Sequence, residues 1–229
     1  MPTGGDGSNP NALGAAVLGT DPLVKNAGVD TGLKLADDTL RAPDVVVNYG
    51  DEKPGWVTTV PPLAVEYVSV GTDEDDLITK IGELMDAGPR WVWGVRLTGP
   101  RRVEVYERGA AMRVVGAEGE LTAPGVLQLP VPVRALYDRT AAHETTLRNL
   151  LARKGYESLE AVRQDGREEG REEGLEALRA TLRAGFAARG WALSVGHAAQ
   201  LDACTEIAIL ARWTTRVFTA QNPDAVFAA

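Results

Sequence analysis

Apolar residues change their spacing along this chain, and the change predicts two kinds of structure. Up to about residue 139 they form short runs of strand length, separated by turn residues such as Gly and Pro. The clearest of these runs are 31–36, 43–49, 63–70, 91–97, 102–107 and 112–115. From about residue 140 strand patterns give way to helical spacing, so we expect a sheet-containing domain followed by a helical region.

One helix interrupts the strands of the first region. Its expected N-cap is Thr72, followed by carboxylates at 73–76 that suit the positive end of a helix dipole, and Gly88 ends it. Its apolar face consists of Leu77, Ile78, Ile81, Leu84 and Met85. A helix between two strands acts as a crossover, so the order predicts an α/β fold with a mixed sheet core and flanking helices.

The run at 63–70 is apolar on both faces apart from Glu66. A strand that is apolar on both faces belongs in the centre of a sheet that is covered on both sides. Glu66 is therefore expected to be buried, and a buried carboxylate needs a cation or hydrogen-bond donors to compensate it.

The C-terminal region contains an Arg-Glu-Glu-Gly repeat that places Gly166, Gly170 and Gly174 along one side of a helix. A solvated connecting helix is one interpretation, and close approach of another helix along the glycines is the other. Two amphipathic helices are expected beyond it, at 175–189 and 205–220. The apolar residues Leu201, Ile207, Leu210, Trp213 and Phe218 predict a helical hairpin or a homodimer through the C-terminal helices.

These patterns predict three parts. Residues 1–24 are expected to be a flexible N-terminal segment with a short helix near 12–18, residues 25–139 the α/β domain, and residues 140–229 an α-helical C-terminal extension. The single cysteine, Cys204, excludes an internal disulfide, and the two histidines exclude a histidine-rich metal site. No apolar run reaches 18 residues and no signal-peptide pattern begins the chain, so we expect no membrane partner and a cytoplasmic location.

The net charge of −8 is concentrated in the first region, where residues 1–139 carry 13 Lys and Arg against 20 Asp and Glu, a net of −7. Nucleic acid is normally held by a basic surface, so this balance counts against a general DNA-binding protein. It does not count against a metal-dependent nuclease, in which clustered carboxylates hold the ion that meets the phosphate.

Three residues form a candidate site: Asp44 after Pro43, Glu66 in the apolar strand, and Lys80 at the margin of the helix face. Two carboxylates on neighbouring strand ends suit a hard ion such as Mg²⁺, and a lysine can orient water or stabilise charge on a phosphate. Each has an alternative interpretation. Asp44 could instead be a turn residue that follows proline. Glu66 could instead form a structural ion pair with an arginine such as Arg90 or Arg96. Lys80 could instead be an ordinary lysine at the boundary between core and solvent.

The segments that contain these residues resemble one known family, the Uma-type putative restriction endonuclease family of the PD-(D/E)xK nuclease superfamily. The resembling segments are 41–47, 61–69, 76–80, 87–93 and 102–106. The resemblance implies a restriction-endonuclease-like core, DNA as substrate, and Mg²⁺, with Mn²⁺ as a substitute. By matching position it implies Asp44, Glu66 and the backbone carbonyl of Tyr67 as metal ligands. The superfamily lysine two residues after the acid is Val68 here, and Lys80 resembles its migrated counterpart.

Three functions therefore compete. The first is a Mg²⁺-dependent DNA endonuclease with Asp44, Glu66 and Lys80 as catalytic residues. The second is a catalytically weak or inactive nuclease-fold module that binds or regulates through its helical tail. The third is a purely structural oligomeric protein. Convergence of the three side chains is required by the first, and their separation would leave only the third.

Overall fold

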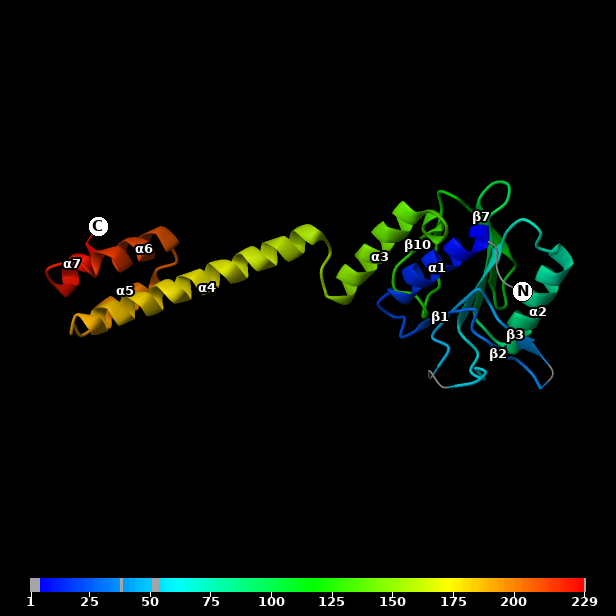
Figure 1. Cartoon of the computed structure of the whole chain (residues 1–229), viewed down its shortest axis with the longest axis horizontal. Helices are drawn as coiled ribbons and strands as arrows, with labels where there is room; N and C mark the ends of the chain where they lie inside the picture. The colour runs from blue at the N-terminus through cyan, green and yellow to red at the C-terminus, as the bar shows by residue number, and fades with distance from the viewer. Residues whose placement is uncertain (1–4, 38, 51–53, 229) are drawn as a thin grey trace. The chain divides into compact units, whose positions relative to one another are not determined.

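The computed structural model describes residues 5–37, 39–50 and 54–228 and divides the chain into two compact units, Met1–Glu157 and Ser158–Ala229 (Figure 1). We describe each unit by itself. The division lies later than the predicted one after residue 139, because helix α3 (Arg139–Arg153) packs on the first unit. No helix within the described ranges combines the length and the apolar character needed to span a bilayer.

The first unit is built on a six-stranded mixed sheet in the order β1-β4-β5-β6-β7-β8. The pair β5–β6 is parallel, and the other neighbouring pairs are antiparallel. The strands are β1 (Ala27–Val29), β4 (Val45–Val47), β5 (Leu63–Val68), β6 (Trp91–Arg96), β7 (Arg102–Glu107) and β8 (Arg113–Gly116). Two-stranded ribbons flank this sheet, formed by β2 (Leu33–Lys34) with β3 (Leu40–Arg41) and β9 (Glu120–Leu121) with β10 (Val131–Pro132). The mixed α/β fold predicted from the sequence is confirmed.

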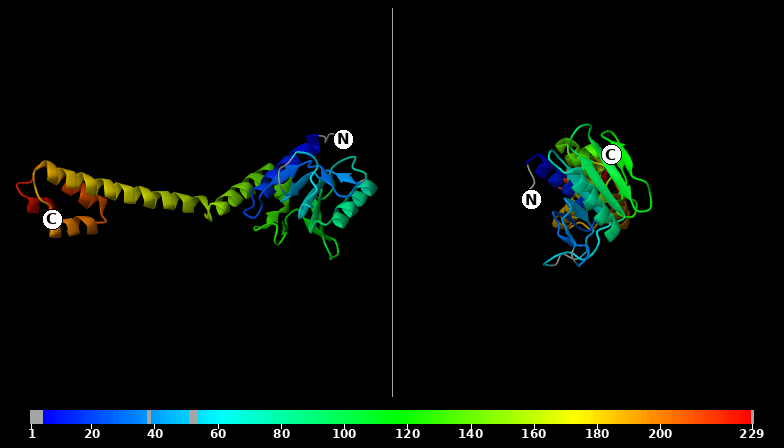
Figure 2. Two further views of the ribbon diagram at one scale, coloured as in Figure 1. Left: turned by 90° about the horizontal axis from the view of Figure 1, so that it is seen from below. Right: turned by 90° about the vertical axis from the view of Figure 1, so that its right-hand side faces the viewer.

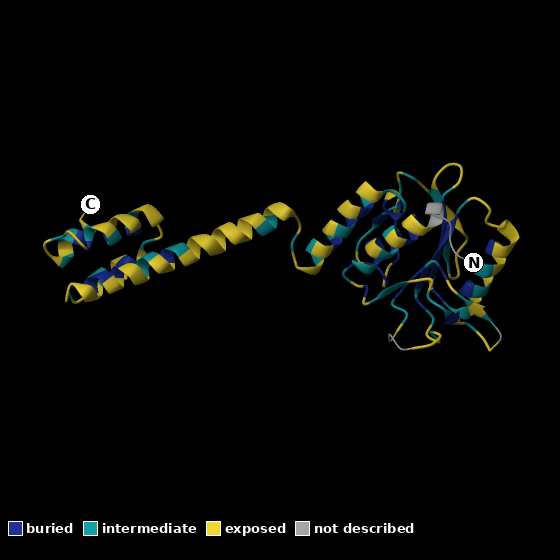
Figure 3. Ribbon diagram, viewed as in Figure 1, coloured by how far each residue is buried: buried dark blue, intermediate teal, exposed yellow. Residues whose placement is uncertain are grey.

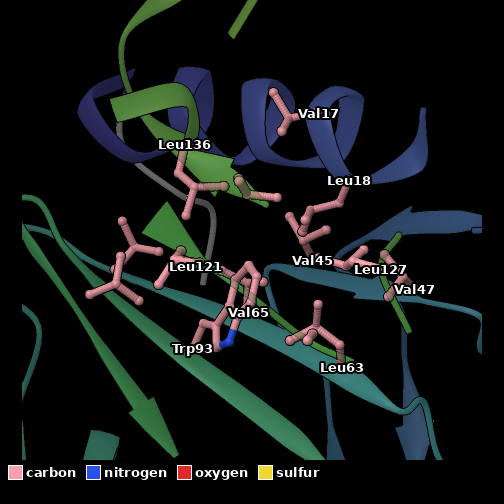
Figure 4. Packing of buried hydrophobic residues seen from close by; sticks show 14 of the residues in the cluster. Val17, Leu18, Val45, Val47, Leu63, Val65, Trp93, Leu121, Leu127 and Leu136 are labelled. Carbon is pink, nitrogen blue, oxygen red and sulfur yellow. The ribbon is translucent and has the colours of Figure 1, made fainter. Parts of the chain in front are cut away.

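Helices cover both faces of this sheet, as predicted for a central strand that is apolar on both sides. Every residue of β5 and β6 is buried. On one face α1 (Gly5–Gly19), α3 and the 3₁₀ turn η1 (Val133–Leu136) enclose the larger core (Figure 4). On the other face α2 (Glu74–Ala87) packs its apolar side chains against β5 and β6.

Helix α1 is longer and better packed than the flexible N-terminal segment predicted from the sequence. It contacts α3, η1, β1, β4 and β5, and Val17 and Leu18 are fully buried in the core. Gly14 lies so close to Tyr67 that an added Cβ would stand 2.1 Å from the tyrosine hydroxyl oxygen. Close packing on the sheet, rather than a strong helical pattern of its own, therefore orders this segment.

Two details of α2 differ from the prediction. Asp73, not Thr72, is the N-cap, and its carboxylate accepts from the backbone N–H groups of Asp75 and Asp76. Ile78 is exposed, because the buried stripe is formed by Leu77, Ile81 and Leu84 and Ile78 lies about 90° from its centre at 100° per residue. Lys80 lies about 70° from that centre on the other side, at the margin of the stripe.

The second unit consists of four helices: α4 (Leu159–Ala188), α5 (Val195–Ala203), α6 (Ile207–Arg216) and α7 (Pro223–Phe227). Figure 2 shows α6 running beside the C-terminal half of α4. The N-terminal half of α4, including the three repeat glycines, is exposed or nearly so on all sides (Figure 3). One continuous helix thus replaces the separate helix predicted at 175–189.

The apolar face from which we predicted a dimer is mostly covered within this unit. Leu201, Leu210 and Trp213 are buried against Leu182 and Phe186 of α4, while Ile207 and Phe218 remain exposed. The hairpin interpretation of this face is the one that the structure adopts. Most of its apolar surface therefore needs no second chain.

Candidate metal centre

The ends of β4 and β5 bring the two predicted carboxylates together. Val45 pairs with Val65 in the antiparallel ladder, so the next positions, Asp44 and Glu66, face each other across the strands. Asp44 directly precedes the first residue of β4, so it lies at the end of that strand. The charge of Asp44 disfavours ionisation of Glu66.

Asp44 is held in place by donors from two elements. Its Oδ2 accepts a 2.6 Å hydrogen bond from the backbone N–H of Tyr67, and its Oδ1 accepts a 3.1 Å bond from Nδ2 of Asn11 on α1. These bonds fix the carboxylate and exclude its interpretation as a simple turn residue. Burial nevertheless outweighs them, so the pKa of Asp44 is raised above its ordinary value.

The backbone of Tyr67 also faces this site. The carbonyl of the next residue, Val68, faces β6, where it accepts a hydrogen bond from the N–H of Leu97. The N–H of Tyr67 points to the opposite side of β5 and donates to Asp44. The N–H and C=O of one strand residue point to the same side, so the Tyr67 carbonyl also faces the β4 side. Pro43, two positions before Val45, has no N–H that could donate to the Tyr67 carbonyl.

Glu66 is 3% exposed and meets the predicted lysine. Lys80 donates from Nζ to Glu66 Oε2 at 2.6 Å and to the carbonyl of Ala42 at 3.2 Å. The other oxygen, Oε1, is buried without a hydrogen-bond partner among the described residues. Leaving such an oxygen unpaired costs about 1–3 kcal/mol, and a ligand that paired with it would remove this cost.

The alternative pairing of Glu66 with an arginine is not seen. Arg96 forms its ion pairs with Glu74 and Glu104, and Arg90 lies over the ring of Trp91. Despite the Lys80 ammonium, desolvation by burial raises the pKa of Glu66 to about 7, and the charge of Asp44 adds to this rise. At neutral pH the carboxyl is therefore close to half protonated, which a bound cation would reverse.

A third acid, Asp30, was not predicted. It follows β1 with a positive φ of 48°, and its backbone N–H bonds to the carbonyl of Asp44. Its exposed carboxylate raises the pKa of both Asp44 and Glu66 through its charge. Asp30 therefore strengthens the negative field at the strand ends.

The donors present fit a hard divalent cation. No group of three or more His, Cys, Asp and Glu side chains in the described part of the chain lies close enough together to hold an ion. Asp44, Glu66 with its unpaired Oε1, and the Tyr67 carbonyl still offer the oxygen donors that Mg²⁺ takes, and Mg²⁺ usually keeps several waters with only one or two protein carboxylates. This arrangement therefore suits Mg²⁺ better than an ion that requires a full protein cage.

Sequence reasoning missed Asn11, which lies in a segment rich in Asn, Gly and Ala. Its side chain is 3% exposed and contacts Asp44 from the opposite face of the sheet to Lys80. The local sequence carries no helical periodicity that would mark it. The available signal was its spacing of three residues from Gly14, which puts both on one side of a helix.

The arginines near this site are already neutralised. Arg41 pairs with Glu83 of α2, and Arg96 donates to both oxygens of Glu74 and of Glu104. The positive charges of Arg41 and Arg96 are thus held in internal ion pairs. Lys80 is also ion-paired, but its partner is Glu66, one of the two carboxylates of the candidate site.

Comparisons with known proteins give one kind of match. No family model matches this chain, and no curated protein matches it. Among solved structures it is similar to a crystal structure described as "a putative nuclease belonging to DUF820" from Anabaena variabilis ATCC 29413. That similarity has 15% sequence identity and a TM-score of 0.49, and it covers 62% of this chain and 84% of the other.

Proposed function

We propose that this protein is a metal-dependent DNA endonuclease in which Asp44 and Glu66 hold Mg²⁺ and Lys80 assists hydrolysis of a phosphodiester bond. The observation that carries the proposal is the arrangement at the ends of β4 and β5. Two carboxylates lie in register, Glu66 keeps one buried oxygen without a partner in the described part of the chain, and the Lys80 ammonium donates to its other oxygen. The same three residues carry the resemblance seen in the sequence.

Each group has a part that follows from its contacts. Asp44 and Glu66 Oε1 would hold the ion together with the Tyr67 carbonyl, with the Tyr67 N–H and Asn11 keeping Asp44 in orientation. When bound, Mg²⁺ would lower the pKa of a water and offset the negative charge that grows on the phosphate. Burial of Glu66 would keep bulk water away from the ion and so strengthen the electrostatic attraction between the ion and the Glu66 carboxylate.

Lys80 is placed to act on the substrate. Its ammonium has three N–H donors, of which Glu66 and the Ala42 carbonyl take two, and no acceptor among the described residues takes the third. We propose that this donor orients the attacking water or stabilises charge on a phosphate oxygen. The side chain is partly exposed, so a phosphate can reach it from solvent.

A plasmid-cleavage assay tests the reaction. With Mg²⁺ or Mn²⁺ present, the wild type should convert supercoiled DNA to nicked or linear forms. Lys80→Met keeps the apolar stem and should lower the cleavage rate by about 10² or more. Lys34→Met is the matched control, because Lys34 lies on β2, away from the site, and its ion pair in the described part of the chain is with Asp37. Cleavage that survives in Lys80→Met would show that Lys80 is an ordinary boundary lysine.

One observation favours the second function, a nuclease-fold module that binds or regulates without turnover. Arg41 and Arg96, on the site's face of the sheet, are committed to internal ion pairs, and residues 1–139 carry a net charge of −7. Little positive charge is then left to attract a polyanion. Ion binding without cleavage of single-stranded, duplex or nicked DNA would support this module over the endonuclease.

A further inference from the structure

We propose that Asn11 is a third side chain of the metal site, holding Asp44 through Nδ2 and turning Oδ1 to the hydrated cation. This inference rests on the proposed function, because it assigns a residue to the same ion. It comes from an unpaired buried oxygen on the opposite side of Asp44 from Lys80.

The amide of Asn11 is used on one side only. Nδ2 donates to Asp44 Oδ1 at 3.1 Å, whereas Oδ1 is buried and has no partner among the described residues. Buried polar atoms are paired in the large majority of cases, so an unpaired one in a 3% exposed side chain calls for a ligand. Glu66 Oε1 is the other unpaired oxygen beside Asp44.

The orientation of the amide follows from its neighbour. An ionised carboxylate only accepts hydrogen bonds, so the branch of the Asn11 amide that meets Asp44 must be its NH₂ group. The carbonyl oxygen is then the branch that has no partner among the described residues. A water molecule of a hydrated cation offers the O–H donor that this carbonyl oxygen lacks.

Helix α1 is anchored in a way that fixes this amide. Gly14, one turn later on the same side, allows the helix to lie against Tyr67, whose N–H is the second donor to Asp44. At the far end of α1, Asn149 of α3 donates to the carbonyl of Val17, and Arg153 donates to the carbonyls of Gly19 and Thr20. A residue on so well-held a helix can keep the ångström-level placement that a metal site needs.

The charge of the site favours an amide at this position. Asp44 and Glu66 already bring two carboxylates together across β4 and β5. Asn11 supplies an oxygen without adding a further charge. Its carbonyl is a usual oxygen donor for hard cations and their waters.

Calorimetric titration of the full-length, metal-free protein with Mn²⁺ tests the inference through two variants at position 11. Asn11→Leu removes both polar atoms at similar volume and should weaken Mn²⁺ binding by about 10- to 100-fold, the usual effect of losing a residue that supports metal ligands. Asn11→Asp loses the donor to Asp44 but puts a charged oxygen beside the ion. It should lower the metal-free melting temperature and bind Mn²⁺ at least as tightly as the wild type.

The matched control is Asn149→Leu. Asn149 is also a buried asparagine at the α1–α3 contact, but it bonds to Val17 and Thr20 and not to the site. It should lower the melting temperature while leaving Mn²⁺ affinity unchanged.

The outcomes separate this inference from the proposed function. Wild-type affinity in Asn11→Leu, or weaker binding in Asn11→Asp than in the wild type, would overturn the role of Oδ1 while leaving the Asp44–Glu66 site intact. A wild-type protein that binds no Mn²⁺ would overturn the proposed function together with this inference. Equal losses in Asn11→Leu and Asn149→Leu would show that Asn11 matters only through the packing of α1.

Discussion

At the scale of single residues, Glu66 shows how burial and pairing compete. Its carboxyl lies 2.6 Å from the Lys80 ammonium, yet its pKa stands at about 7, because the cost of removing the charge from water exceeds the attraction of the lysine. The metal-free site is thus a place where the chain gives up stability. A cation would restore that stability by pairing the second oxygen.

This cost has a definite pH dependence. The folded-state pKa of Glu66 lies above its ordinary value of 4.5, so the folded protein binds the proton more tightly than the unfolded chain does. The contribution of Glu66 to the free energy of unfolding is then fully present below pH 4.5 and is lost as the pH rises through about 7. The change is about 3 kcal/mol. Asp44 shifts in the same direction and adds to the loss.

We therefore predict that Glu66→Gln stabilises the metal-free protein, relative to the wild type, more at pH 8 than at pH 5. Urea unfolding in a chelator at both values should show the wild type losing about 3 kcal/mol more than Glu66→Gln between them. Glu83→Gln, which removes an acid of α2 paired with Arg41, should follow the wild type. Parallel pH curves for the wild type and Glu66→Gln would contradict the burial of an unneutralised carboxyl.

At the scale of elements, the sequence predicted what hydrophobic pattern controls and missed what packing controls. The strands at β5, β6 and β7 and helix α2 were predicted because their apolar spacing is strong. The register that sets Asp44 opposite Glu66 follows from the ladder of β4 and β5, and the sequence alone predicted both acids at neighbouring strand ends. Helix α1 was missed as a packed element because tertiary contacts order it, and Asn11 was missed with it.

The exposed half of α4 allows the two interpretations of the glycine repeat to be separated. A Cβ added at Gly166, Gly170 or Gly174 meets nothing within 4 Å, so alanine at all three should stabilise the helix by roughly 0.5–1 kcal/mol per site. Thermal unfolding of the triple variant followed by circular dichroism measures this gain. A loss of stability, accompanied by a lower mass in light scattering, would instead show that another helix packs along the glycines.

At the scale of the whole molecule, the site residues and the helical tail belong to different units. Asn11, Asp44, Glu66 and Lys80 all lie in Met1–Glu157, which has its own core on both faces of the sheet. The homodimer through the C-terminal helices stays a prediction, and most of the apolar face that suggested it is buried inside the second unit.

A chain truncated after Glu157 should then fold and keep the Mn²⁺ affinity of the full-length protein. Truncation after residue 139 should instead fail to fold stably, because it removes α3 with the bonds of Asn149 and Arg153 to the end of α1. Circular dichroism and calorimetry on both chains measure this difference. The division of the chain described above would be contradicted if the chain ending at Glu157 does not fold. It would also be contradicted if the chain ending at residue 139 binds Mn²⁺ with the affinity of the full-length protein.

The most direct test of the metal centre is calorimetric titration of the metal-free protein with Mn²⁺ and Mg²⁺ across four variants. We predict that the wild type binds the ion, that Asp44→Ala and Glu66→Gln abolish the heat of binding, and that Lys80→Met keeps it. Asp30→Asn should weaken binding only modestly, because Asp30 acts through its charge from an exposed position. Equal binding by the wild type, Asp44→Ala and Glu66→Gln, or no binding by the wild type, would contradict the account.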